Sequence, residues 1–281
     1  MSTARPPVIR RLFLLSPGAR IALGVVVFLW LVAAASPLFS ERSRAIRLDE
    51  RLQPPSAAHP FGTDDLGRDL LARVVTATPI SLAIGLVAAA VSLGVGFTVG
   101  ATAGYVGGVV DLVLSRLIEI ILCFPVLFLL LALAALLPPS PLTVILAIGL
   151  TAWPSDARYA RAEVLKIREL DYTRAAKVAG ASTPRILARH LLPNALPPLI
   201  VSAAFGVGWA ILAEAALSFL GVGLPAPAIS WGGILAAAPN TIEEAWWIAL
   251  FPGLALFLTV SAYNRLAEGL RAATTRAGRK A

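Results

Sequence analysis

Six stretches of the chain are apolar over enough residues to cross a membrane as helices. A helix needs about 20 predominantly apolar residues to span the hydrocarbon core of a bilayer. The stretches that meet this requirement are 21–39, 80–104, 117–137, 142–159, 199–221 and 246–267. The pattern predicts an all-α membrane protein, built as a bundle of six transmembrane helices.

Polar segments of very different length separate these stretches. They are 40–79, 105–116, 138–141, 160–198 and 222–245, with tails at 1–20 and 268–281. We divide the chain into three parts on this basis. Residues 1–79 hold the N-terminal tail, the first span and an outer loop, residues 80–268 form a five-helix core that contains loop 160–198, and residues 269–281 form a basic tail.

The composition agrees with a membrane protein. Apolar residues make up 58% of the 281 residues and charged residues only 14%, whereas about 25% of the residues of a soluble domain are charged. A single cysteine, Cys123, excludes a disulfide framework and a cysteine-based metal site. The two histidines, His59 and His190, argue against a histidine-rich metal centre. We therefore expect no bound metal.

The basic residues predict the orientation, because Lys and Arg are retained on the cytoplasmic side of a membrane. The N-terminal tail, Arg116, the stretch 156–191 and the C-terminal end share one side and hold 18 of the 24 Lys and Arg residues. Segment 40–79 on the other side has six, matched by six acidic residues. Both termini and loop 160–198 are therefore expected in the cytoplasm.

The start of the chain has a second interpretation. Basic residues, an apolar run from Ile21 and the small residues Ala33 to Ser36 also occur in cleavable signal peptides. The run of about nineteen apolar residues exceeds the usual 7–15 of a signal peptide, which favours a retained span. The charge count does not separate the two interpretations.

Small residues recur every fourth position in the second span. They are Ser92, Gly96, Gly100, Gly104 and Gly108. Such a face lets a second helix approach closely, and close packing drives helix association in lipid. The stripe predicts a packing face, with the alternative that this face slides during a transport cycle.

One carboxylate, Glu214, stands inside the fifth span between Ala213 and Ala215. A carboxylate in the membrane is costly unless it is paired, hydrated or protonated. Glu214 is therefore either a fixed interhelical partner or a polar group on the translocation path. Trp246 and Trp247 open the sixth span on the outer side, where interfacial aromatic residues are common.

The chain lacks the motifs of the common catalytic sites. It contains no G-K-[ST] phosphate-binding loop and no H-E-x-x-H motif. We therefore expect a protein that is not an enzyme, with no catalytic residue and no cofactor of its own.

The cytoplasmic segment 171–194 predicts two short helices with a bend between them. Asp171 is a good N-cap, and Gly180 stands where a left-handed glycine ends a helix. Thr183 and Pro184 then begin a second helix that Pro193 is expected to stop. The first helix exposes Ala175, Ala176 and Ala179, a small-residue surface that a partner can approach closely. The alternative is a loop that lies on the membrane surface, but such helices have large apolar anchors.

This segment resembles the cytoplasmic signature of ABC importer permeases that work with a binding protein. The signature reads EAA, three residues, Gly, nine residues, then I-x-L-P. Ala175, Ala176, Gly180, Leu192 and Pro193 match it at the right spacing. Arg174 replaces the Glu and His190 replaces the Ile. Because Arg174 stands in place of the Glu, this chain cannot make a contact in which that Glu pairs with a basic group of the ATPase.

Further motifs resemble the dipeptide, oligopeptide and nickel branch of that family, in its second-permease type. They are His59 to Asp64, Gly67 to Asp69, Gly104-Tyr105 with Gly107-Gly108, Phe124-Pro125, Glu214 to Gly221, Ser230 to Gly232 and Phe251 to Gly253. This resemblance covers most of the chain.

The resemblance implies the fold of a type I ABC importer permease with a bent cytoplasmic coupling helix, in the inner cell membrane. It implies a second, similar permease, two ATPase subunits that bind ATP, and a periplasmic or lipid-anchored solute-binding protein as partners. It gives the ATPase-coupling role to Ala175, Ala176, Ala179, Gly180, Leu192 and Pro193. The expected function is inward transport of peptides or a related small solute. A secondary transporter or membrane scaffold that works without ATPases is the alternative.

Overall fold

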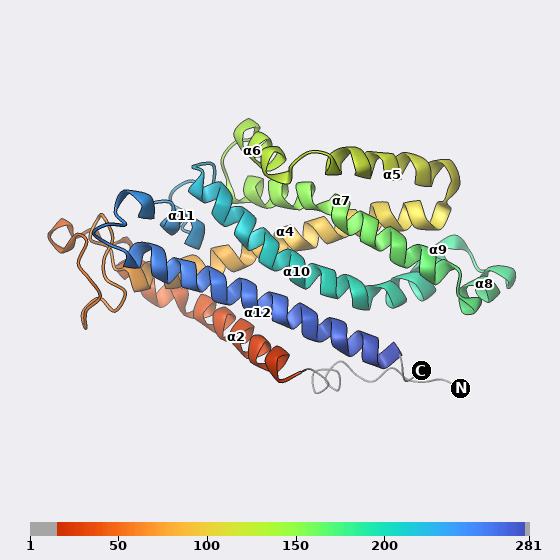
Figure 1. The fold of residues 1–281 in the computed structure, drawn as a ribbon, viewed down its shortest axis with the longest axis horizontal. Helices are drawn as coiled ribbons and strands as arrows, with labels where there is room; N and C mark the ends of the chain where they lie inside the picture. Colours follow the sequence, from red (N-terminus) through yellow and green to blue (C-terminus); the bar gives the residue numbers. More distant parts are fainter. Residues whose placement is uncertain (1–15, 279–281) are drawn as a thin grey trace.

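The computed structural model of the chain describes residues 16–278 and consists of long helices that lie side by side (Figure 1). The basic residues Arg5, Arg10, Arg11, Arg279 and Lys280, which contribute to the predicted orientation, lie outside the described residues. The long helices are α2 Pro17–Ala35, α4 Leu70–Val106, α5 Gly108–Leu122, α6 Val126–Leu136, α7 Pro141–Arg168, α10 Leu192–Phe219 and α12 Trp247–Gly278.

Short helical segments connect them. They are η1 Ser36–Phe39, α3 Ser40–Arg44, η2 Leu48–Glu50, α8 Asp171–Val178, α9 Thr183–Ile186, η3 Leu187–Leu191, α11 Trp231–Leu235 and η4 Ala238–Asn240. Over residues 16–278 the structure contains no strand beyond an isolated bridge between Thr63 and Asp69. The predicted all-α fold class is confirmed.

Side chains next to the apolar runs set where the helices begin. The hydroxyl of Ser16 accepts from the amide of Ala19 at the start of α2, and the carboxylate of Asp69 accepts from the amide of Ala72 at the start of α4. Ser140 caps α7 in the same way. Each cap supplies an acceptor to an amide that has no partner inside its own helix.

Judged by length and composition, the described helices include fewer membrane spans than the six that the sequence predicts. Within residues 16–278, four helical stretches are long and apolar enough to cross a membrane: Pro17–Arg44, α4, α10 and Trp247–Ala273. The α5–α6 pair makes a fifth if it counts as one span. The predicted window 142–159 forms the first part of α7, but Asp156 and Arg158 lower the hydropathy of that helix.

The predicted third span, 117–137, is not one continuous helix. α5 ends at Leu122, α6 begins at Val126, and the two helices meet at 86°. Pro125 lies in the break and has no amide hydrogen, so it cannot continue the hydrogen-bond ladder of α5. The break places Phe124 beside the other helices rather than inside a straight span.

The stripe of small residues on α4 packs against α7. A Cβ atom added at Gly96 would lie 2.6 Å from the Cβ of Asp156, and one at Gly104 would lie 2.9 Å from the carbonyl oxygen of Arg161. A Cβ atom at Gly100 would lie closer still to the carbonyl oxygen of Ala157. Gly108 was expected on this face, but α4 ends at Val106 and Gly108 begins α5 with φ of 58°. The packing interpretation is confirmed for the three glycines inside the helix.

Segment 222–245 folds back into the bundle instead of forming an open loop. The ring of Trp231, at the start of α11, is buried, and its indole N–H donates to the carbonyl of Val74 at 3.0 Å. Its backbone amide donates to the hydroxyl of Ser81 at 3.0 Å. α11 is therefore fixed against α4.

α8 and α9 lie at one end of the bundle, at the end where α2 begins and α12 finishes (Figure 1). α6 and α11 lie at the opposite end. This arrangement puts the predicted cytoplasmic segments together at one end.

Candidate functional site

The segment between α7 and α10 forms the bent element that the sequence predicts. α8 ends at Val178, and Gly180 follows with φ of 79°. The amide of Gly180 donates to the carbonyl of Lys177 at 3.1 Å, and the amide of Ala181 donates to the carbonyl of Ala176 at 3.0 Å. These two bonds form a Schellman motif, which requires a left-handed residue after the helix. The predicted role of Gly180 in the turn is confirmed.

The helix begins differently from the prediction. Leu170 occupies the N-cap position, and Asp171 is the first residue of α8. An acidic residue in the first turn is still favourable, because the N-terminal end of a helix dipole is positive.

α8 presents an exposed, mostly apolar face. Val178 is 89% exposed, which is the largest exposed fraction among the large apolar residues that the structure describes. Tyr172, Ala175 and Ala179 are also exposed and lie on the same helical face as Val178 by their spacing of three and four residues. Ala176 is half-buried. We call Tyr172, Ala175, Val178 and Ala179 the α8 face. The sequence prediction did not include Val178.

The second arm of the element is anchored in the bundle. Ile186 and Leu191 are buried in a cluster with Val164 and Ile167 of α7 and Leu199 of α10. The apolar anchor holds the element in place and leaves the α8 face exposed.

Pro193 does not stop the second helix, contrary to the prediction. The segment Leu187–Leu191 is a π-helical turn, and Leu192 donates its amide to the carbonyl of Leu187 before α10 continues. Pro193 stands in the first turn of α10. The missing amide hydrogen of proline costs little there, because amides in the first turn have no acceptor within their own helix. Leu192 is 37% exposed, and Pro193 is half-buried at this junction.

Two arginines join the bent element and the bundle. Arg174 forms an ion pair with Glu169, the residue that follows α7. The hydrogen bond from Arg174 lowers the pKa of the Glu169 carboxyl, so this exposed pair is retained in neutral solution and lost when the pH falls through that lowered pKa. Arg168 donates to the carbonyls of Gly104 at 3.0 Å and Tyr105 at 3.3 Å, at the end of α4. These contacts link α8 to the end of α7, and that end to α4.

Glu214 is fully buried at 0% exposure, between α10 and α11. Its Oε1 accepts from the hydroxyl of Ser218 at 2.7 Å and from the hydroxyl of Ser230 at 2.6 Å. Ser230 also caps α11 by accepting from the amide of Gly233. These contacts favour the interpretation of Glu214 as a fixed partner between elements.

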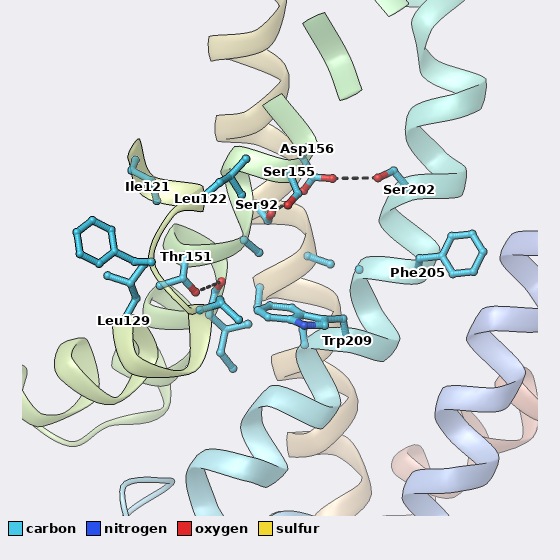
Figure 2. A pocket seen from close by; sticks show the side chains of 18 residues that line it. Ser92, Ile121, Leu122, Leu129, Thr151, Ser155, Asp156, Ser202, Phe205 and Trp209 are labelled. Carbon is cyan, nitrogen blue, oxygen red and sulfur yellow. Dashed lines mark hydrogen bonds between the residues drawn. The ribbon is translucent and has the colours of Figure 1, made fainter. Parts of the chain in front are cut away.

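A second carboxylate, Asp156, lies beside a cavity in the middle of the bundle (Figure 2). The cavity has a volume of about 330 Å³ and is open to one side. α4, α7, α10 and the break between α5 and α6 line it, and Figure 2 shows Thr151, Phe205, Trp209 and Leu129 around it. Most of the lining is apolar.

Asp156 holds three helices together. Its Oδ2 accepts from the hydroxyl of Ser92 on α4 at 2.6 Å, and its Oδ1 accepts from the hydroxyl of Ser202 on α10 at 2.9 Å. The sequence analysis missed this residue, although an acidic residue inside the window 142–159 is the same signal that identified Glu214. Ser92 was noted there only as a small residue of the packing face.

A bundle of apolar helices with a carboxylate beside a cavity that is open to one side, and with an exposed helix at one end, is the architecture of a membrane protein and is compatible with transport. Residues 96–276 match the family model described as binding-protein-dependent transport system inner membrane component, so the chain belongs to this family. The family assignment confirms the resemblance in the sequence and identifies an inner-membrane component of an ABC importer.

Curated relatives cover most of the chain. A dipeptide transport system permease protein, DppC, of Alkalihalophilus pseudofirmus is 41% identical over 254 residues, which are 90% of this chain and 84% of the relative. The protein of the same name in Bacillus subtilis is 39% identical over 256 residues, which are 90% of this chain and 80% of the relative.

The fold is also that of a solved ABC transporter chain. A chain of the MetNI methionine ABC transporter, solved in inward-facing conformations, aligns with a TM-score of 0.56 at 20% sequence identity. The alignment covers 72% of this chain and 97% of that chain. It supports the predicted type I importer permease fold.

Proposed function

We propose that this chain is the permease subunit of an ATP-driven importer that moves di- or oligopeptides across the inner membrane. The family assignment gives the importer class, and the names of the relatives support a peptide as the solute. In this proposal the chain performs no catalysis, and ATP is bound and hydrolysed by partner subunits.

The proposed assembly contains this chain, a second similar permease, two ATPase subunits and a solute-binding protein outside the membrane. Both termini and the bent element lie in the cytoplasm in this proposal, in agreement with the excess of basic residues on that side. An ABC importer permease works with ATPase and binding-protein partners. The presence of two permease and two ATPase subunits in one complex is part of the proposal.

The observation that best supports the proposal is the α8 face. Tyr172 and Val178 lie with Ala175 and Ala179 on one exposed, mostly apolar face, and a protein partner that covers this face removes apolar surface from water. Ala175 and Ala179 on the same face leave room for close approach. We assign ATPase coupling to this face and to Ala176, Gly180, Leu192 and Pro193, which shape the element around it.

Force on the α8 face has a direct route into the bundle. Arg174 joins α8 to Glu169 at the end of α7, and Arg168 joins the same end to α4. Closure of the ATPases would move α8 and shift the bundle between two packings of its helices.

The proposal is tested by purifying the tagged chain from its native membrane and identifying what comes with it. Wild type is expected to retain ATPase subunits with Walker motifs. Val178→Glu is expected to reduce the retained ATPase about tenfold, because a charge buried at an apolar contact costs at least about 1.4 kcal/mol. Ser182→Glu adds the same charge beyond the turn, at an exposed position, and is the matched control.

Equal retention in both variants would remove the coupling role of the α8 face. Purification without any ATPase, together with peptide uptake that depends on an ion gradient, would instead establish a secondary transporter.

A further inference from the structure

Asp156 differs from the other carboxylates inside the bundle. Glu214 is fully buried, and Asp111 forms an ion pair with Arg161. Asp156 is partly exposed, lines a cavity, and accepts hydrogen bonds from the hydroxyls of Ser92 and Ser202 (Figure 2). Among the side chains that the structure describes, no basic group forms an ion pair with it.

The two hydroxyls leave part of the carboxylate's capacity unused. A carboxylate accepts about four hydrogen bonds, and Asp156 receives one on each oxygen from the serines. Asp156 stands near the end of the predicted span 142–159, and an ionisable group within a span marks a functional site by default. An asparagine would join the same three helices at lower cost, so the charge itself requires an explanation.

Two cavities meet at this residue. Ser155, Asp156 and Ser202 line both the apolar cavity of about 330 Å³ and a second cavity of about 440 Å³. Arg158, Tyr159 and Ala162, further along α7, line the second cavity. The volume of the apolar cavity lies at the lower end of the roughly 300–1,000 Å³ of ligand pockets in general, whereas the second cavity is more open to its surroundings. Asp156 therefore stands between an apolar chamber and a polar one that contains a positive charge.

This arrangement matches the chemistry of a short peptide in its zwitterionic form. An ammonium group carries three donors and a positive charge, which suit the unused acceptors of Asp156. The apolar cavity offers Phe124, Phe205 and Trp209 to a side chain of the peptide, and Arg158 offers a positive charge to its carboxyl end.

We propose that Asp156 binds the α-ammonium group of a peptide during its passage through the bundle, with Ser92 and Ser202 holding the carboxylate in position. The site is a temporary one within the permease, distinct from the capture of the solute outside the membrane. This inference rests on the proposed function for the identity of the solute. Its cation-binding chemistry is tested separately from transport.

The first experiment measures the local charge without any transport. Ser155→Cys, in a Cys123→Ser background, places a single thiol where the two cavities meet. The purified complex is treated with small cationic and neutral methanethiosulfonate reagents of similar size. The ratio of the two modification rates is expected to fall about tenfold when Asp156→Asn is added. Glu163→Gln, on the same helix but not in either cavity lining, is the matched control and should leave the ratio unchanged.

The second experiment uses the Asp156 side chain intact, so it does not depend on how the variant folds. Alanyl-alanine and alanyl-alanine amide are expected to slow modification of the thiol at position 155 by the neutral reagent. N-acetyl-alanyl-alanine, which has no ammonium group, is expected to give at least tenfold weaker protection. Equal protection by the acetylated peptide, or protection by none of the three at millimolar concentration, would overturn the proposal.

Uptake separates this inference from the proposed function. Labelled alanyl-alanine should enter vesicles that contain the wild-type complex, its binding protein and ATP, and Asp156→Asn should lower that rate at least tenfold while ATPase retention stays normal. Wild-type transport with an unaffected variant would refute only the role of Asp156. No ATP-dependent peptide uptake by wild type would refute the proposed function, and the thiol experiments would still decide whether Asp156 attracts an ammonium group.

Discussion

The indole N–H of Trp247 donates to the backbone carbonyl of Thr63 at 3.0 Å, which joins the start of α12 to the segment between α3 and α4. Trp247 is 4% exposed, whereas its neighbour Trp246 is 52% exposed. The rings of Phe61 and Phe251 stack beside this bond at a centroid distance of 3.9 Å. Both tryptophans were expected at the membrane interface, but Trp247 is an internal contact.

Replacing Trp247 should therefore destabilise the protein, and replacing Trp246 should not. Trp247→Phe keeps an aromatic ring but leaves the buried carbonyl of Thr63 without this donor, which should lower the free energy of unfolding by about 1–3 kcal/mol. Trp246→Phe is the matched control. Thermal unfolding of the solubilised protein measures both, and equal midpoints would show that the hydrogen bond contributes nothing.

The helix packing on α4 gives a second prediction. A Cβ atom at Gly100 would overlap the backbone of Ala157, whereas one at Gly94 would meet nothing within 4 Å. Gly100→Ala should therefore force α4 and α7 apart and cost about 1–3 kcal/mol, while Gly94→Ala should be neutral or slightly stabilising. Thermal stability of the two solubilised variants is the measurement. A cost for Gly94→Ala as large as that for Gly100→Ala would mean that the close approach is not what matters.

The sequence could predict these local features because each depends on residues close together in the chain. Apolar length located the helices, the spacing of Gly96, Gly100 and Gly104 located the packing face, and Gly180 located the turn. The direction of the chain after Pro125 was not predictable in this way, because the apolar pattern continues across the break. No residue pattern distinguishes the π-helical turn at Leu187–Leu191 from an ordinary helix, so the sequence predicts a helix end at Pro193 where the chain continues into α10.

The site around Asp156 shows the limit most clearly. The carboxylate itself is visible in the sequence, but its partners are 64 and 46 residues away. The cavity exists only because the α5–α6 break, α7 and α10 come together. The apolar residues around Asp156 in the sequence show that its charge lies in an unfavourable environment. Only the packing of segments far apart in the chain shows that the carboxylate lines a cavity.

Glu214 should behave as a hydrogen-bond acceptor between α10 and α11. Glu214→Gln keeps a carbonyl oxygen for the hydroxyls of Ser218 and Ser230 and should retain stability and uptake. Glu214→Leu leaves both hydroxyls without this acceptor and should cost about 1–3 kcal/mol. Thermal stability and peptide uptake are measured together. Loss of uptake in Glu214→Gln with normal stability would instead indicate a role on the translocation path.

The orientation is tested with single cysteines in a Cys123→Ser background. Ser182 is exposed beside α8 and should be protected from an impermeant thiol reagent in intact cells, because we place this end in the cytoplasm. Glu243 is exposed in segment 222–245 and should react. Permeabilised cells, in which both cysteines should react, are the control. Labelling of Ser182→Cys but not Glu243→Cys in intact cells would reverse the orientation.

The turn at Gly180 allows a test of the coupling element in which size and conformation are separated. A Cβ atom at Gly180 would meet nothing within 4 Å, so a side chain there is penalised only through the backbone, at φ of 79°. Valine is strongly disfavoured in this left-handed conformation, at a cost of roughly 1–2 kcal/mol or more, whereas asparagine adopts it readily. Gly180→Val should therefore distort the end of α8 and abolish most uptake, and Gly180→Asn should retain it.

Membrane abundance should stay near wild type in both variants, because residue 180 lies outside the helices that are long and apolar enough to span. ATPase retention and stimulation of ATP hydrolysis by loaded binding protein locate the defect. Wild-type uptake, retention and stimulation in Gly180→Val would show that the bent element does not couple hydrolysis to transport.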